Sequence, residues 1–166
     1  MNDLLPVPSI LLSVKPHWAE AIRDGRKKLE VRTRVPRQLL NIGHERRHCV
    51  CRERGLPEHW LPAYAYIYAT APVQKVVARC NLHTITLHDG PPDSWCLENS
   101  HLSREQWDAL SARCCPVDCL WKLYLTRPEP RDVPLATLRQ HLSGMPPQGW
   151  RYIYWPELCG LEEATT

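Results

Sequence analysis

The stretch SVKPHWAEAIRDGRKKLEVRTR, residues 13–34, contains the end of one predicted strand, a complete predicted helix and a second predicted strand. Alternating apolar residues over 10–15 predict the first strand, with Lys15 at its end. Pro16 opens the helix at a position where the missing N–H of proline costs nothing, and Gly25 supplies its stop. The sequence therefore predicts a local strand, helix and strand that follow one another without long connections.

The second of these strands, residues 28–34, carries one acid among several bases. Its charged residues alternate with uncharged ones, so a strand would place the side chains of Lys28, Glu30, Arg32 and Arg34 on one face. Glu30 can accept hydrogen bonds from an amine or a hydroxyl, while Arg32 and Lys15 can hold anionic oxygens or carbonyls. This pattern suits a nucleotide, which offers both kinds of group. The alternative is an exposed strand on which Glu30 pairs with Lys28 or Arg32.

The rest of the chain predicts more strands, with helices only locally. Strands are predicted at 64–70 and 117–126, and residues 73–88 are one long bent strand or two. Capping-box spacing at Ser103 and Gln106 predicts a helix that ends before Pro116.

Proline and glycine punctuate the predicted connections. Residues 36–63 and 89–102 are predicted loops, and the prolines at 128, 130 and 134 are expected to break the chain. A short helix is predicted at 135–142. Because no regular alternation of strand and helix is present, we expect an α+β fold with a curled, mainly antiparallel sheet.

Length and charge limit the protein class. At 166 residues the chain is predicted to form one domain, 1–166, with a core that needs no disulfides. The net charge is only +3, but residues 15–54 carry twelve bases against five acids, which favours an anionic partner such as nucleic acid. The sequence shows no signal peptide and no apolar run long enough to span a membrane, so we expect a cytoplasmic protein without membrane contact, whose cysteines are reduced.

Two segments together resemble the ASCH domain of the PUA-like superfamily. The residues that match are Ser13, Lys15 and Pro16; Gly25, Lys27, Glu30 and Arg32; and Tyr66 through Val73. This resemblance covers most of residues 9–88, and PPQGWRY near the C-terminus is similar to a feature of phage and prophage members. It implies a small PUA-like β-barrel with short flanking helices, and residues 36–63 then look like a loop insertion.

The resemblance also implies a site and a partner. ASCH-like proteins are associated with RNA or modified-nucleotide recognition, so a basic cleft that binds RNA or a modified nucleoside is expected. Tyr68 is placed to stack on a base, and Trp150 to wall the cleft. The expected nucleic-acid-binding residues are Ser13, Lys15, Lys28, Glu30, Arg32, Arg34, Tyr68 and Trp150.

Other functions start from the same residues. Some ASCH-like proteins are amidohydrolases that act on N4-acylated cytidine, and Lys27 stands at the position of their lysine, whereas Glu30 stands where they have threonine. Others are ribonucleases, which need a base and an acid near a scissile phosphate, and Lys15, Glu30 and Tyr68 are available for these roles. Lys27 and Glu30 are the candidate catalytic residues. A third alternative is a phage or prophage protein-interaction module whose basic loop contacts an acidic partner.

No cofactor or metal is expected from the sequence. Gly-rich phosphate loops, dinucleotide fingerprints and serine-hydrolase elbows are absent. The cysteines and histidines crowd into HERRHCVC at 44–51 and CCPVDC at 114–119, but neither segment has paired C-x-x-C knuckles. We therefore interpret these segments as thiols and a polar loop, with zinc as the minor alternative.

Overall fold

The computed structural model describes residues 9–34, 63–114 and 119–153, together with 157, 160, 161 and 163. In chain order the elements are β1 (Ser9–Val14), α1 (Pro16–Arg23), β2 (Leu29–Arg32), β3 (Ala63–Ala69), β4 (Lys75–Asp89), α4 (Ser94–Ser100), α5 (Arg104–Ser111), β5 (Cys119–Pro134), α6 (Leu135–His141) and β6 (Trp150–Ile153). The predicted insertion at 36–63 lies almost wholly outside the described residues.

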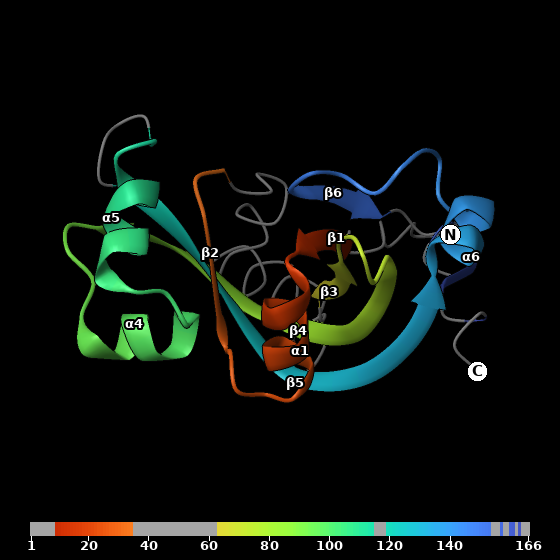
Figure 1. Ribbon diagram of the computed structural model, residues 1–166, viewed down its shortest axis with the longest axis horizontal. Coiled ribbons are helices and arrows are strands. Elements are labelled where there is room, and N and C mark those ends of the chain that lie inside the picture. Colours follow the sequence, from red (N-terminus) through yellow and green to blue (C-terminus); the bar gives the residue numbers. More distant parts are fainter. Residues whose placement is uncertain are drawn as a thin grey trace, which may run out of the picture.

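The strands form one curled sheet in the order β2-β5-β4-β3-β1-β6 (Figure 1). β1 pairs in parallel with β3, and the other described pairs are antiparallel. The expected α+β fold with a mainly antiparallel sheet is confirmed, with the sheet curled into a half-barrel. Helices α4 and α5 lie at one end of the sheet and α6 lies at the other, while α1 lies between them (Figure 1).

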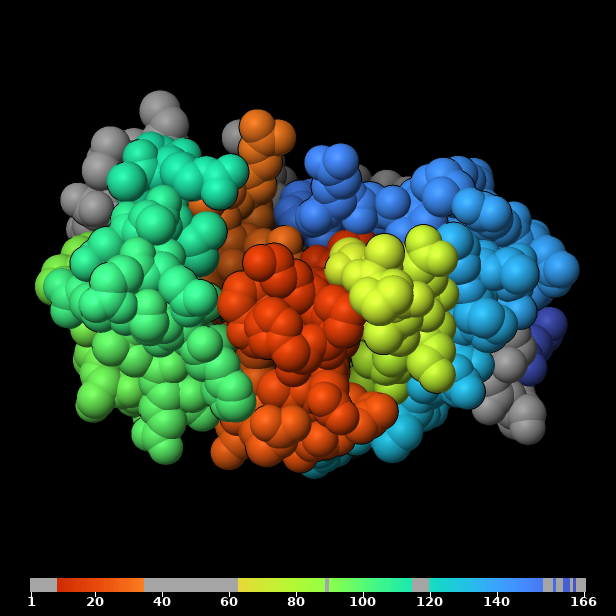
Figure 2. Space-filling view, in the orientation of Figure 1, coloured from red at the N-terminus to blue at the C-terminus, as the bar shows by residue number. Residues whose placement is uncertain are grey.

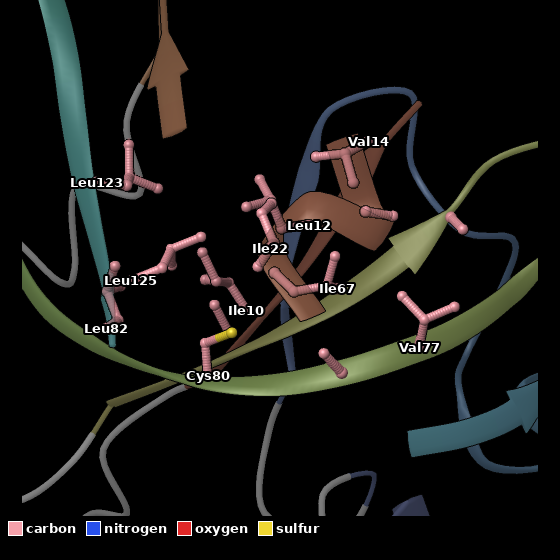
Figure 3. Packing of buried hydrophobic residues seen from close by; sticks show 14 of the residues in the cluster. Ile10, Leu12, Val14, Ile22, Ile67, Val77, Cys80, Leu82, Leu123 and Leu125 are labelled. Carbon is pink, nitrogen blue, oxygen red and sulfur yellow. The ribbon is translucent and has the colours of Figure 1, made fainter. Parts of the chain in front are cut away.

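Three apolar clusters form the core of the described residues. The largest joins α1 to the sheet and includes Ile10, Leu12, Ile22, Ile67 and Leu125 (Figure 3). A second cluster lies on the other side of β1, where Leu11 packs with residues of β3, β5 and α6. The third packs α4 and α5 against β2 and β5. Because β1 is covered on both sides, all six of its residues are buried.

Two of the predicted connections are wrong. Residues 89–102 are not simply a loop, since Asp93 caps α4 by accepting a hydrogen bond from the backbone N–H of Cys96 at 2.7 Å. The prolines at 128 and 130 do not break the chain, because β5 continues to Pro134. β2 pairs with β5 only over residues 121–124, so β2 needs no N–H group from Pro128 or Pro130. On the other side of β5, the register with β4 shifts near these two prolines.

The remaining element predictions hold, except that the strand predicted at 28–34 covers only Leu29–Arg32. β4 is a single strand with register shifts, which settles the choice between one strand and two. The capping box at Ser103 and Gln106 is present at the start of α5, and the short helix near 135–142 is α6. These elements are specified by local sequence signals that no distant contact overrides.

Gly25 ends α1 with φ of +73°, a conformation in which other residues are strained. An added Cβ would meet only Pro128 Cγ at 3.8 Å, so strain and not collision would decide the effect. We expect Gly25→Ala to lower the free energy of unfolding by about 1–2 kcal/mol in urea titrations. Gly149→Ala is the control, because its Cβ would enter open space at an ordinary φ. Equal stability of the two variants would contradict this account.

Candidate ligand-binding cleft

A cleft of about 390 Å³ opens where β1, β2, α1 and α5 meet. In the space-filling view, part of β2 (orange) is visible between α5 (green) and α1 (red) (Figure 2). The residues that line the cleft are Ser13, Val14, Lys15, Trp18, Lys27, Glu30, Val31, Arg32, Thr33, Thr70, Leu102, Leu110, Arg113 and Gln148. Its size falls within the range that small-ligand sites occupy.

The cleft contains a buried carboxylate held between two cations. Glu30 is 4 % exposed, and its Oε2 lies 3.1 Å from Lys27 Nζ. Its Oε1 lies 2.9 Å from Arg32 Nη2, which also donates to the backbone oxygen of Ser13 at 2.7 Å. Arg32 therefore connects the edge strand β2 to β1. Glu30 is therefore not part of an exposed surface pair. It is the buried centre of an ion triad with Lys27 and Arg32.

Lys27 is 2 % exposed and has all of its hydrogen-bonding capacity in use. Its ammonium donates to the backbone oxygen of Leu29 at 2.8 Å and to that of Ser100, in addition to the ion pair with Glu30. A protonated lysine has three N–H donors, so these contacts account for them all. The arrangement stabilises Lys27 as a cation that positions Glu30 and joins β2 to α4.

Trp18 forms an aromatic wall that the sequence did not reveal as part of a site. It packs against the third cluster and also lines the cleft. The ammonium groups of Lys15 and Lys27 lie 5.5 and 5.6 Å from the centre of its ring. Both distances fall within cation–π range, so the ring orients the two lysines.

The opposite wall comes from the helical segment around α5. Leu102, Leu110 and Arg113 line the cleft there, although they lie far along the chain from β1 and β2. No spacing in the sequence connected these residues to the charged strand. Gln148 also lines the cleft, so part of the PPQGWRY segment does reach it.

The structure brings together only some of the predicted binding residues. Ser13, Lys15, Glu30 and Arg32 line the cleft, as does Lys27. Lys28 is exposed and lines a separate cavity of about 270 Å³. The reason is that β2 begins only at Leu29, so the alternation of side chains does not extend back to Lys28.

The other three predicted residues do not line the cleft either. Tyr68 is 5 % exposed within the second apolar cluster, where burial raises the pKa of its hydroxyl. Trp150 contacts Tyr152, and its indole N–H donates to the backbone oxygen of Arg34 at 3.3 Å. That bond connects β6 to the segment after β2, so Trp150 and Arg34 help to hold the two sheet edges near each other.

Among the described residues, no group of three or more histidine, cysteine or acidic side chains is arranged to hold a metal ion. The HERRHCVC segment and most of CCPVDC lie outside those residues. No helix in the described ranges has the length and apolar character to cross a membrane.

The curled sheet and its helices form a PUA-like α+β fold with a cleft lined by four cationic side chains, and solved structures share this fold. An ASCH protein from Zymomonas mobilis superposes with a TM-score of 0.72 at 25% identity, covering 95% of this chain and 96% of that one. A serine-to-alanine variant of the Zymomonas protein gives a TM-score of 0.70 at 23% identity, covering 98% of this chain and 100% of that one.

A tyrosine-to-phenylalanine variant gives a TM-score of 0.69 at 24% identity, with 95% of this chain and 99% of that one covered. The described part of this chain thus has the ASCH fold. No protein-family model and no curated protein matches the sequence. Because one fold hosts many functions, function has to be argued from the cleft.

Proposed function

We propose that this protein recognises RNA or a modified nucleobase through the cleft. The observation that carries the proposal is the buried Glu30 carboxylate, fixed by Lys27 and Arg32 beside the ring of Trp18. Each carboxylate oxygen keeps acceptor capacity beyond its one ion pair, so Glu30 can still accept from a base amine or a ribose hydroxyl.

Unused polar atoms support a binding role. Ser13 Oγ and Arg32 Nε are buried and have no hydrogen-bond partner among the described residues. Buried polar groups are normally paired, and both residues line the cleft. Ligand atoms that reached these groups would satisfy them, and the apolar side chains of Leu102 and Leu110 would cover the face of a base.

Recognition is favoured over amide hydrolysis by the contacts of Lys27. The amidohydrolase alternative needs Lys27 to act as a base or to activate a hydroxyl, whereas its buried ammonium group already donates to the backbone oxygens of Leu29 and Ser100 and pairs with Glu30. We therefore assign Lys27 and Glu30 to positioning and recognition. Action in the cytoplasm and the phage or prophage type stay predictions from the sequence.

Lys15 offers the cleanest test, since it is exposed and its described contact is with the ring of Trp18. Arg32 is less suitable because it also connects β2 to β1. We expect Lys15→Ala to weaken binding of labelled single-stranded RNA about tenfold in anisotropy titrations. The slope of the logarithm of the binding constant against the logarithm of the salt concentration should decrease in magnitude by about one, because one cation is lost.

Lys28→Ala is the matched control, because it removes the same charge from an exposed position outside the cleft. It is expected to leave RNA affinity within about twofold of wild type, because an exposed charge that does not line the cleft is largely screened by salt. Equal losses in both variants would show that the charge of the region, and not the cleft, binds RNA. Absence of RNA binding by the wild-type protein would refute RNA recognition and leave a modified nucleobase as the ligand to test. Recovery of a nuclease-insensitive protein partner would then support the interaction-module alternative.

A further inference from the structure

The charges that line the cleft do not balance. Four cationic side chains and one carboxylate line it. Glu30 is shared by Lys27 and Arg32, the two cations nearest to it. Lys15 and Arg113 have no carboxylate partner among the described residues. A cleft with two unpaired cations attracts an anion.

These two cations are placed at the exposed part of the cleft and on different walls. Lys15 precedes α1, and Arg113 follows Ala112, the C-cap of α5. Both residues are exposed, in contrast to the buried Lys27 and Glu30. The backbone N–H of Arg113 donates to the backbone oxygen of Leu110 at 3.0 Å, and this hydrogen bond holds the backbone of Arg113 against the end of α5.

We propose that the ligand carries a phosphate, and that Lys15 and Arg113 bind it from the two walls of the cleft. A phosphate is strongly hydrated, so binding it at the exposed part of the cleft costs less free energy of dehydration than binding it at a buried position. Arginine offers a planar fork that matches two phosphate oxygens, and lysine adds a point charge. The base then lies deeper, between Trp18 and the leucines of the opposite wall, with Glu30 accepting from it.

This inference rests on the proposed function and makes it narrower. It assigns the ligand to the class of phosphorylated nucleotides, either free or within an RNA strand, and excludes the uncharged nucleoside as the preferred ligand. It also gives α5 a part in specificity through Arg113. The other role open to Arg113 is to complement the C-terminal end of the α5 dipole, which would affect stability alone.

Competition against bound RNA tests the inference. The wild-type protein with labelled single-stranded RNA bound is titrated with each of the four ribonucleoside 5′-monophosphates and, separately, with the matching nucleosides. We expect the most effective monophosphate to compete at about tenfold lower concentration than its nucleoside. In Arg113→Gln the ratio of the competing nucleoside concentration to the competing monophosphate concentration should fall to about threefold, with the melting temperature of the protein unchanged.

Arg104→Gln is the matched control. It removes the same charge from the first residue of α5, where Arg104 pairs with Asp108 and does not line the cleft. It should keep the wild-type ratio. If RNA binds but nucleotides and nucleosides compete equally, the inference is overturned and the proposed function stands. The same holds if Arg113→Gln lowers the melting temperature without changing the ratio. If the wild-type protein binds no RNA, RNA recognition fails and this inference fails with it.

Discussion

Replacing Glu30 with leucine is expected to lower the free energy of unfolding by about 3–5 kcal/mol, the usual cost of leaving a buried charge unpaired. Lys27 would keep its two backbone acceptors but lose its only described counter-charge, with the like-charged Arg32 nearby. Equilibrium unfolding in urea at neutral pH measures the change. The expected loss is a large fraction of the stability of an ordinary domain.

Two further variants separate the charge effect from the change of side chain. Glu98→Leu makes the same substitution at an exposed position of α4 and should cost less than about 0.5 kcal/mol. Lys27→Met combined with Glu30→Leu removes both members of the pair, so it should be more stable than Glu30→Leu alone. A double variant less stable than the single one would contradict the assignment of Lys27 as the cation that depends on Glu30.

Trp107→Ala should also destabilise the protein by about 3–5 kcal/mol, because it leaves a large cavity in the third apolar cluster. Trp107 is 0% exposed and packs with residues of β2, α4 and β5. The edge of its ring also contacts the ring of His88, with centroids 5.1 Å apart. Thermal and urea unfolding measure the loss.

Trp95→Ala supplies the control, since Trp95 is 45% exposed and stacks on one ring, that of Tyr124. Its expected cost is below about 1 kcal/mol. The same core supports the cleft, because Leu102 belongs to the cluster and also lines the wall that faces Trp18. Similar losses in the two tryptophan variants would show that the α5 segment is not anchored as the structure describes.

Local sequence signals predicted most of the framework of the fold. Pro16 and Gly25 bound α1, and the capping box at Ser103 starts α5, because each signal acts through hydrogen bonds within a few residues. The prolines of β5 misled the prediction, since their tolerance depends on which neighbouring strand needs their N–H groups. That information lies in the pairing of the sheet and not in the strand itself.

The sequence by itself determined the α+β class, the order of most elements and the pairing of an acid with bases around Glu30. Tertiary structure alone decided that Lys27 and not Lys28 joins that pair, that Tyr68 is buried in the core, and that Trp18 and Arg113 form opposite walls of the cleft. The physical reason is that short-range periodicity sets which residues form strands and helices. The composition of a cleft depends instead on packing between elements that are distant in the chain, and on the burial that this packing imposes on each charge.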